Sequence, residues 1–493
     1  MTRRATIVGA GPNGLTAAVV LARLGYAVRV LEASDAPGGG ARTGALTLPG
    51  FRHDLGSAVH PGAVASPVFA ALGVTGAVDW LTPEISYAHA IAPGRSALAW
   101  RDIERTAHAL DADERAWLAM LRPLARHAEA VAGFTGDQLL RVPADPVVAA
   151  RFGARALELA AGRGLRTPAA RALMWGVMAH ANTRTPSLGA AGGGLLLGAQ
   201  GHALGWPVPR GGAQAITDAL LARLAEAGGT VATGIHVRTL QDLDWGDARR
   251  GDLLLLDTSP RLLLSHPDLP SSYLRAVQRF PYGPAVAKVD LALSGPVPWA
   301  DPALADAVTV HVGGSAAEVE RAEADVARGR VPRHPYVIAV QPSVLDPGRA
   351  PAGSAVLWAY AHVPNGSTAD PAGFVIDRLE HFAPGLRDRV LAVHGTPASA
   401  REAQNPAAIG GDISGGAFSM RQAVVRPVLS RHPWRTPLPG VYLCSASTPP
   451  GPAVHGRNGW LAARLAVQDA TRRRLTLDDV RERTSPARSQ RGV

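Results

Sequence analysis

Three glycines near the N-terminus have the spacing that a bound dinucleotide requires. Gly9, Gly11 and Gly14 follow a short apolar run, Ala5–Val8, and precede a segment of helical periodicity, Leu15–Leu24. In a strand–turn–helix unit the first glycine allows the tight turn, the second leaves room for a pyrophosphate, and the third lets the helix pack on the sheet. The free amides at the start of the helix then face the phosphates. The sequence therefore predicts a dinucleotide site here.

A carboxylate follows the second predicted strand. The strand Ala27–Leu31 alternates and ends on Glu32. A carboxylate at this place accepts hydrogen bonds from both ribose hydroxyls and repels a 2′-phosphate, so NADP is disfavoured. This unit alone leaves FAD and NAD open.

A second glycine-rich loop favours FAD. Gly38-Gly39-Gly40-Ala41-Arg42-Thr43 lies a few residues beyond Glu32, close enough to return to the diphosphate. The Arg42 guanidinium could bind that anion through two parallel hydrogen bonds. The alternative is an ordinary glycine turn with a surface arginine.

Together these motifs resemble the extended dinucleotide motif of the phytoene desaturase and amine oxidase flavoprotein superfamily. Further segments fit the same pattern: Gly50–Ser57 is similar to its G-F-x-x-D-x-G segment, Pro209–Gly212 to its P-x-G-G segment, and Val237 to a position that meets adenine. Residues 405–422 and 440–459 are similar to the branch named pyridine nucleotide-disulfide oxidoreductase domain-containing protein 2. The resemblance covers the chain up to about residue 475 and implies bound FAD without fixing a substrate.

One departure from the family lies in the stretch Pro449-Pro450-Gly451-Pro452, a loop that is richer in glycine in relatives. We still expect this loop to present its backbone to the flavin. The motifs and the resemblance together predict the following FAD-binding residues: Gly9, Gly11, Pro12, Asn13, Gly14, Glu32, Ala33, Gly39, Gly40, Ala41, Arg42, Gly56, Ser57, Val237, Ser447, Val454, His455 and Gly456.

Three residues are candidates for a catalytic role. His455 lies in the loop that the family places at the flavin, and His60 follows the segment expected to run along it; either could instead be an ordinary buried or loop histidine. Lys288 is the only lysine among 50 basic residues. Amine oxidases often place a lysine near flavin N5, where it orders water; the alternative is a surface lysine on a strand.

Other reactive side chains have ordinary explanations. Asp54 is expected to fix its loop through backbone hydrogen bonds rather than to act as a base. Asp412 lies in a glycine-flanked turn and could line the substrate entrance or form an Asx turn. Cys444, the only cysteine, could carry a covalent flavin but is favoured as a small strand residue. The 16 histidines form no H-x-H or H-E-x-x-H cluster, so no metal site is predicted.

These motifs require two domains built from alternating segments. The 493 residues exceed what a single core holds. We predict the α/β class, with a Rossmann-like FAD-binding domain interleaved with a mixed α+β substrate domain that contains a helical insertion. The expected bounds are 1–70, 205–280 and 430–475 for the FAD-binding domain, 71–204 and 281–429 for the substrate domain, and 476–493 for a disordered basic tail. Residue patterns predict a mostly helical region from about 70 to 200, notably 103–132 and 147–162, a helix at 214–226, and strands at 230–237, 253–256 and from 285 to 293.

Composition narrows the remaining choices. The net charge of +10 comes from arginines spread among acids, which does not point to nucleic acid. The single cysteine fits a reducing cytoplasm, and neither a signal peptide nor a membrane-spanning helix is expected. Apolar, glycine-rich segments such as Gly192–Gly198 favour a lipophilic small-molecule substrate and leave peripheral membrane contact open. The oligomeric state is not predicted, and a homodimer is one possibility.

The predicted activity is hydride transfer from a hydrophobic substrate to flavin N5, with reoxidation by oxygen or a quinone-like acceptor. No second G-x-G-x-x-G is present for a nicotinamide. A flavin amine oxidase, a redox-neutral isomerase using reduced flavin and a flavin-binding interaction protein with little catalysis remain alternatives.

Overall fold

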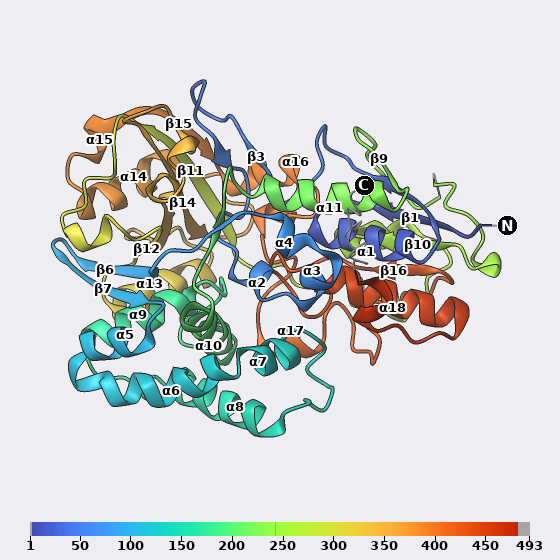
Figure 1. Ribbon diagram of the computed structural model, residues 1–493, viewed down its shortest axis with the longest axis horizontal. Helices are drawn as coiled ribbons and strands as arrows, with labels where there is room; N and C mark the ends of the chain where they lie inside the picture. The colour runs from blue at the N-terminus through green and yellow to red at the C-terminus, as the bar shows by residue number, and fades with distance from the viewer. Residues whose placement is uncertain (1, 242, 482–493) are drawn as a thin grey trace, which may run out of the picture.

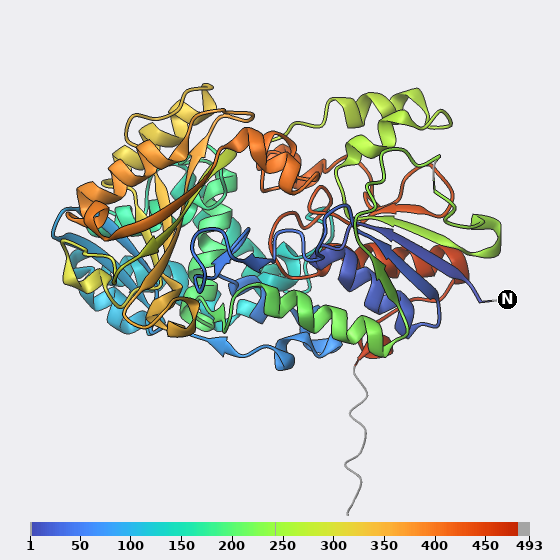
Figure 2. The ribbon, with the colours of Figure 1, turned by 90° about the horizontal axis from the view of Figure 1, so that it is seen from above.

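Two separate sheets organise the chain (Figure 1). The computed structural model describes residues 2–241 and 243–481. Segments from the start, middle and end of the sequence meet in one lobe, where blue, green and red lie together in Figure 2. The predicted α/β class with interleaved domains is confirmed. Domain boundaries near residues 70, 205, 280 and 430 remain our proposal.

The first sheet has five parallel strands in the order β16-β10-β1-β2-β9. The strands are short, apolar and β-branched or leucine-rich, as expected where both faces are covered. Parallel pairing brings the carboxyl ends together, with Val8 opposite both Leu31 and Leu256. The predicted strand Thr230–Val237 is wrong in extent, because pairing with β2 ends at Ala232. The strands are β1 (Arg4–Val8), β2 (Ala27–Leu31), β9 (Thr230–Ala232), β10 (Leu253–Leu256) and β16 (Val441–Leu443).

Three long helices cover this sheet: α1 (Pro12–Arg23), α11 (Gln214–Glu226) and α18 (Arg457–Thr471). Their small and aliphatic side chains form one core with β1, β2 and β10. Gly459 lets α18 approach α1 closely, since a Cβ there would lie 2.0 Å from the Asn13 carbonyl oxygen. This packing fixes the start of α1 against the sheet edge.

The second sheet has seven strands in the order β15-β11-β14-β13-β12-β6-β7 and is mostly antiparallel, with β12 and β6 parallel. Helices α13 (Ala316–Ala327) and α14 (Pro371–Phe382) pack against it. The strands are β6 (Ile85–Ala92), β7 (Arg95–Trp100), β11 (Ala285–Leu293), β12 (Thr309–Val312), β13 (Val337–Val340), β14 (Ala355–Val363) and β15 (Val390–Thr396).

The region between residues 70 and 200 is less helical than expected. It contains β6 and β7, which complete the second sheet by pairing with each other and, through β6, with β12. It also contains β5 (Trp80–Leu81), which pairs with β8 (Val208–Pro209) in a small separate sheet. The periodic stretch 103–132 is also divided, with a break at His127, four residues after Pro123. The helices are α5 (Ile103–Ala109), α6 (Glu114–Arg126), α7 (Ala128–Thr135), α8 (Pro146–Ala160), α9 (Pro168–Ala179) and α10 (Leu188–Ala203).

Short elements complete the fold. The expected tail begins with a packed turn, η9 (Leu477–Val480), whose Val480 is buried and accepts a hydrogen bond from Arg23. Residues 482–493 of that tail lie outside the described residues. The remaining elements are β3 (Thr43–Gly44), β4 (His53–Asp54), β8 (Val208–Pro209), α2 (Pro61–Val64), α3 (Pro67–Leu72), α4 (Val74–Ala77), α12 (Ser271–Gln278), α15 (Leu386–Arg389), α16 (Arg401–Gln404), α17 (Met420–Val424) and the 3-10 turns η1 (Asp111–Asp113), η2 (Ala248–Arg250), η3 (Pro260–Ser265), η4 (Pro302–Leu304), η5 (Pro342–Val344), η6 (Pro347–Arg349), η7 (Ala398–Ala400) and η8 (Ile409–Gly411).

Candidate functional site

One continuous cavity of about 1470 Å³ joins the two sheets. At one end it is bordered by the carboxyl ends of β1, β2 and β10; at the other by β11, β13, β14 and one face of α10. Ligand sites for drug-sized molecules occupy roughly 300–1,000 Å³, so this cavity can hold a dinucleotide and a second molecule together. Most of the predicted site residues line it: Gly9, Gly11, Pro12, Asn13, Glu32, Ala33, Gly39, Gly40, Arg42, Gly56, Ser57, His60, Val237, Lys288, Ser447, Val454 and His455.

The three glycines of the first loop are required by close contacts. Gly9 has φ +98°, and a Cβ there would lie 2.4 Å from the Asp257 carbonyl oxygen. A Cβ on Gly14 would lie 2.1 Å from the Gly9 carbonyl oxygen. Gly14 therefore serves helix packing and does not border the cavity, whereas Gly9 and Gly11 do.

The Glu32 carboxylate is held in place and can still accept further hydrogen bonds. It is 7% exposed; Oε2 accepts the Ala10 amide at 2.7 Å and Oε1 accepts the Ser34 amide at 2.9 Å. Each carboxylate oxygen has a further lone pair. The carboxylate is thus positioned to accept the ribose hydroxyls that the sequence predicted.

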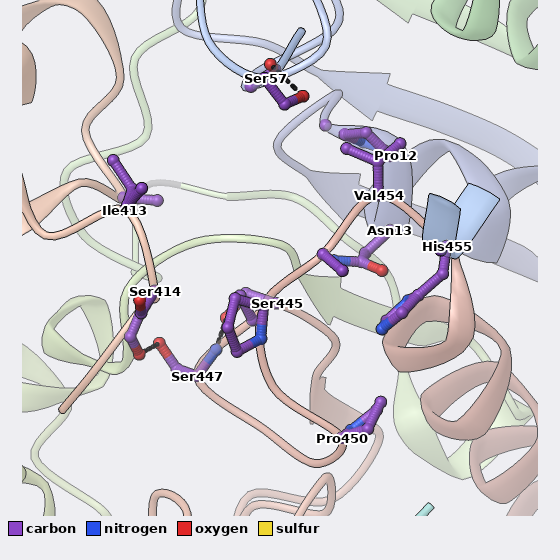
Figure 3. A pocket seen from close by; sticks show the side chains of 18 of the residues that line it. Pro12, Asn13, Ser57, Ile413, Ser414, Ser445, Ser447, Pro450, Val454 and His455 are labelled. Atoms are coloured by element: carbon purple, nitrogen blue, oxygen red, sulfur yellow. Dashed lines mark hydrogen bonds between the residues drawn. The ribbon is translucent and has the colours of Figure 1, made fainter. Parts of the chain in front are cut away.

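The N-terminus of α1 opens into the cavity (Figure 3). Gly11 is its N-cap and makes no side-chain capping bond. Asn13 is buried, and its Oδ1 has no hydrogen-bond partner within the protein. Pro12 has no amide hydrogen and the Gly14 amide is bonded to Asp257, so the Asn13 amide is the group of this first turn that remains for an acceptor. The buried Asn13 Oδ1 could be satisfied by a ligand that donates a hydrogen bond.

The second glycine loop lies against the first one. The Gly38 amide donates to the Ala10 carbonyl oxygen at 2.8 Å, and a Cβ on Gly39 would lie 3.1 Å from the Gly11 Cα. Arg42 borders the cavity, with Nε 3.3 Å from the Gly39 carbonyl oxygen and Nη2 3.2 Å from that of Gln404. Ala41 is buried, and its carbonyl oxygen accepts a hydrogen bond from Thr217 instead of facing the cavity.

A second carboxylate, which lies behind the first loop, was not predicted from the sequence. Asp257 directly follows β10, and its Oδ2 accepts the Gly14 amide at 2.7 Å. Burial raises the pKa of this carboxyl to about 7, with the charge of Glu32 adding to the effect. Its position at the carboxyl end of a predicted parallel strand was a usable signal.

The C-terminal loop closes over the same end of the cavity (Figure 3). Ser447 Oγ donates to the Gly415 carbonyl oxygen at 2.7 Å, and Val454 and His455 border the cavity. Desolvation lowers the pKa of His455 to about 3, so its imidazole is neutral near pH 7. Gly456, with φ +67°, packs against Thr16 and Phe69 rather than lining the cavity.

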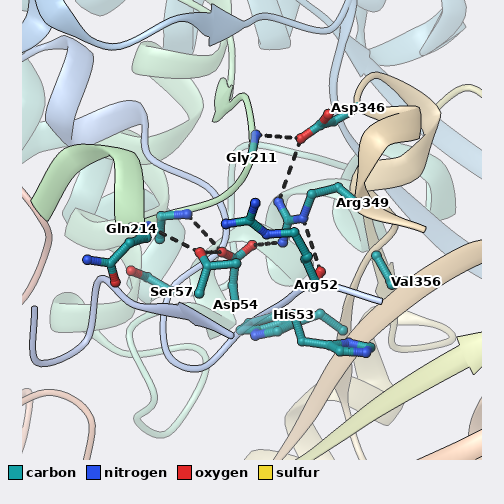
Figure 4. Close-up of polar contacts among 12 residues, drawn as sticks. Arg52, His53, Asp54, Ser57, Gly211, Gln214, Asp346, Arg349 and Val356 are labelled. Carbon is teal, nitrogen blue, oxygen red and sulfur yellow. Dashed lines mark hydrogen bonds and ion pairs between the residues drawn. The ribbon is translucent and has the colours of Figure 1, made fainter. Parts of the chain in front are cut away.

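Asp54 joins three segments (Figure 4). Its Oδ1 accepts from Thr43 Oγ1 at 2.7 Å and from the Ala213 amide at 2.8 Å, while Oδ2 pairs with Arg349. The carboxylate therefore ties its own segment to Thr43 and to the residue after the Pro209–Gly212 motif, and backbone amides account for only part of its bonding. Arg349 was not predicted.

Lys288 is not a surface residue. It is 2% exposed, borders the cavity, and forms an ion pair with Asp290, two residues further along β11. Burial lowers the pKa of Lys288 and raises that of Asp290, while their mutual attraction opposes both shifts. His53 Nδ1 lies 3.6 Å from Asp290 Oδ1, so the carboxylate has a second neighbour.

The part of the cavity beyond Lys288 is mainly apolar with one histidine cluster at its wall. His60 borders it, and burial lowers its pKa to about 4. His180 Nε2 lies 2.7 Å from His311 Nε2, and Trp206 packs edge-on against both rings. These two histidines were not predicted, since they come from α9 and β12 and meet only in the folded chain.

The open alternatives for Asp412 and Cys444 can now be compared with their surroundings. Asp412 is 1% exposed and accepts the amides of Gly283, Ser414 and Gly416, the pattern of a loop-fixing carboxylate. Cys444 is fully buried in the core of the first sheet and does not border the cavity. Asp412 therefore fixes its turn and also borders the cavity, so both of its expected roles fit, whereas Cys444 fits the core explanation.

Residues 2–241 and 243–481 contain no group of three or more His, Cys, Asp or Glu side chains arranged for a metal ion. Within the same residues, none of the helices combines the length and apolar character needed to span a bilayer.

Comparison with known proteins agrees with this architecture. Residues 7–72 match the family described as NAD(P)-binding Rossmann-like domain. The mouse protein named pyridine nucleotide-disulfide oxidoreductase domain-containing protein 2 is 26% identical over 313 residues, which cover 56% of this chain and 53% of the relative. The chain thus aligns with about half the length of that relative. An L-amino-acid oxidase from Daboia russelii is 54% identical over 50 residues, 10% of each chain.

Solved structures share the fold at low identity. A redesigned putrescine oxidase has a TM-score of 0.61 at 15% identity, covering 96% of this chain and 99% of that one. An oxidoreductase from Methanosarcina mazei has a TM-score of 0.56 at 15% identity, covering 94% of this chain and 100% of that one. The chain therefore contains an NAD(P)-binding Rossmann-like domain, is homologous over part of its length to pyridine nucleotide-disulfide oxidoreductase domain-containing protein 2, as the motifs indicated, and shares its overall fold with these structures.

Proposed function

We propose that this protein is an FAD-dependent oxidoreductase of the dehydrogenase or desaturase type, acting on a hydrophobic organic substrate. The observation that carries the proposal is one cavity with two connected parts. The first part is bordered by the dinucleotide loops. The second part, which we call the apolar arm, is bordered by one face of α10 and by Lys288 of the second sheet. A cofactor lying along the first part would present its reactive end to a molecule in the second. The homology and the shared fold support the same reading.

The chain has groups suited to each part of FAD. Glu32 would accept the ribose hydroxyls, and the first turn of α1 with Asn13 would donate to the diphosphate. Arg42 would reach the same anion after exchanging its present carbonyl contacts. Gly56 and Ser57 border the cavity further along, where the isoalloxazine ring would lie.

When bound, FAD would accept a hydride from a substrate C–H bond and pass the electrons to oxygen or a quinone-like acceptor. Lys288 would contribute a buried ammonium group held by Asp290, able to order a water or donate a proton at the cavity wall. His60 and His455 carry lowered pKa values and would act as neutral hydrogen-bonding groups near pH 7.

The walls of the arm favour a hydrophobic substrate over an amine. One face of α10 borders it with small and aliphatic residues, namely Gly189, Gly192, Gly193, Leu196 and Leu197. The described carboxylates that border the cavity are already bonded to amides or arginines of the chain: Glu32, Asp137, Asp257, Glu402 and Asp412. None of these five carboxylates belongs to α10, which forms a wall of the arm.

Amine oxidation is the second candidate because Trp358 and Tyr360 stand edge to face at 5.0 Å on the cavity wall. Aromatic rings can enclose a cationic amine. However, Lys288 Nζ already lies 5.7 Å from the Trp358 ring centroid, and its charge would repel a second cation.

The test is anaerobic bleaching of the flavin spectrum with a panel of lipids, polyenes and amines. Bleaching by apolar compounds supports the proposal, and bleaching by amines alone supports the second candidate. Failure of every compound, with the flavin bound, favours an interaction protein with little catalysis. We also propose a cytoplasmic location, which suits a chain with one buried cysteine.

A further inference from the structure

Exposed apolar side chains are concentrated on one face of the molecule. The described residues include thirteen large hydrophobic side chains that are exposed, and seven of them fall in two short segments. Five lie between residues 139 and 157 and two between 420 and 429. We call these seven the portal patch: Leu139, Leu140, Val142, Val147, Leu157, Met420 and Leu429.

The two segments lie next to each other in space. The Gln138 side chain donates to the Ser430 carbonyl oxygen, which joins the α7–α8 loop to the segment after α17. Helices α7, α8 and α17 lie together on the lower side of Figure 1. Leu429 directly precedes Ser430 and Val142 lies four residues after Gln138; they are 70% and 91% exposed.

The portal patch surrounds an opening of the cavity. Leu139, Leu157 and Met420 border the cavity and are also 41%, 62% and 42% exposed. Side chains that face both the cavity and the solvent mark a place where the cavity reaches the surface. Inside this opening the lining continues as apolar residues, including Phe152, Leu196 and Phe418.

The charge around the patch is mixed but includes several exposed arginines. Residues 138–157 and 413–432 contain six arginines and Asp145, which caps α8; Asp137 and Glu158 lie directly outside these ranges and pair with Arg141 and Arg155. Arg426 is buried, while Arg151, Arg421 and Arg431 are exposed. Apolar side chains flanked by arginines are the combination that anionic lipid surfaces attract.

We propose that the portal patch docks on an anionic phospholipid bilayer, so that the cavity opens toward the lipid. Large exposed apolar patches on protein surfaces usually mark interaction sites. The arginines would approach the phosphate groups while the exposed leucines and valines enter the interface. As an entry route for a lipophilic substrate the proposal rests on the proposed function, but the docking itself does not require flavin.

The test is co-sedimentation of the flavin-containing protein with two kinds of vesicle: pure phosphatidylcholine, and an equal mixture of phosphatidylcholine and phosphatidylglycerol. We expect binding to the mixed vesicles and little to the neutral ones. The double variant V142E/L429E should lower the bound fraction at least about tenfold, and R421Q/R431Q should lower it on mixed vesicles. The control L391E/V393E makes the same kind of change at two exposed residues of β15, 50% and 42% exposed, outside the patch, and should bind as the wild type does.

Three results would overturn the proposal. The first is equal binding of the wild type to both kinds of vesicle, and the second is unchanged binding of V142E/L429E. The third is a wild-type dimer that V142E/L429E converts to a monomer in light scattering, which would mean that a second copy of the chain covers the patch. The flavin spectrum of the same samples keeps the two proposals apart. A protein that binds vesicles without flavin fails only the proposed function, and one that holds flavin but ignores lipid fails only the docking.

Discussion

Arg349 Nη2 lies 2.8 Å from Asp54 Oδ2, and both side chains are 1% exposed (Figure 4). The pair connects the segment that leads into the cavity lining at Leu55–Ser57 to the turn before β14 in the second sheet. Arg349 Nε also donates to the Arg52 carbonyl oxygen at 3.1 Å. A buried charge pair behind the cavity lining therefore links the two lobes.

Replacement of Arg349 should lower the free energy of unfolding. R349M leaves the Asp54 carboxylate charged, buried and without its cation, a situation that typically costs about 3–5 kcal/mol. We expect that loss in the free energy of unfolding measured by urea denaturation. R210M, which breaks the exposed pair with Asp79, is the control and should leave stability unchanged. Equal effects of the two variants would contradict the role given to Arg349.

Glu32 should decide the affinity for FAD. E32Q keeps an acceptor for the Ala10 amide but weakens the charge-assisted bonds to the ribose, which are worth about 1.5–3 kcal/mol. The dissociation constant for FAD, measured by fluorescence quenching on the apoprotein, should rise about 10- to 100-fold. D35N changes an exposed carboxylate three residues away and should not alter it. The same rise in both variants would mean that net charge, rather than the ribose contact, controls binding.

Asp257 should make the apoprotein less stable as pH rises. Burial raises the pKa of its carboxyl from 3.8 to about 7. Between these values the folded chain keeps a proton that the unfolded chain has released, so the free energy of unfolding falls with pH by about 1.4 kcal/mol per unit. Above about pH 7 the Asp257 carboxyl is ionised in both the folded and the unfolded chain, so it no longer makes the free energy of unfolding depend on pH.

D257N cannot ionise and still accepts the Gly14 amide. We therefore expect the stability of the variant relative to wild type to rise between about pH 4 and pH 7 and then to level off. Urea denaturation at several pH values measures this difference. If the free energies of unfolding of D257N and wild type change in parallel with pH, the pKa of Asp257 is not raised in the folded protein.

Lys288 should control the reoxidation of the reduced enzyme. K288M removes the ammonium group from the cavity wall, and D290N removes the carboxylate that holds it. Stopped-flow mixing of dithionite-reduced enzyme with oxygen should show at least about a tenfold slower rate for K288M. D290N should shift the pH dependence of this rate, because the lysine loses its partner. A K288M rate equal to that of wild type would exclude this role for Lys288.

Much of the cofactor site could be predicted because its signals are local. The spacing of Gly9, Gly11 and Gly14 and the acid at Glu32 follow from a single strand–turn–helix–strand unit, and α11, β10 and β11 have the bounds that their periodicity indicated. Such patterns depend on neighbours in sequence. The strand after α11 was overextended because its later residues follow residues 32–34 through backbone bonds without forming a ladder.

The residues that sequence reasoning missed depend on distant contacts. Arg349 meets Asp54, and His311 meets His180, across 295 and 131 positions of the chain. Strands β6 and β7 were read as part of a helical region because their alanines suit either structure, and only pairing with β12 decides between them. Pairing between separate segments has no local signature.

The central claim is that the cavity between the sheets binds FAD. The most direct measurement is the visible spectrum of the purified protein, followed by denaturation and mass identification of any released flavin. We predict a yellow protein that carries about one FAD per chain, and a smaller bound fraction in E32Q. A colourless protein that gains no flavin spectrum even after incubation with FAD would exclude FAD binding.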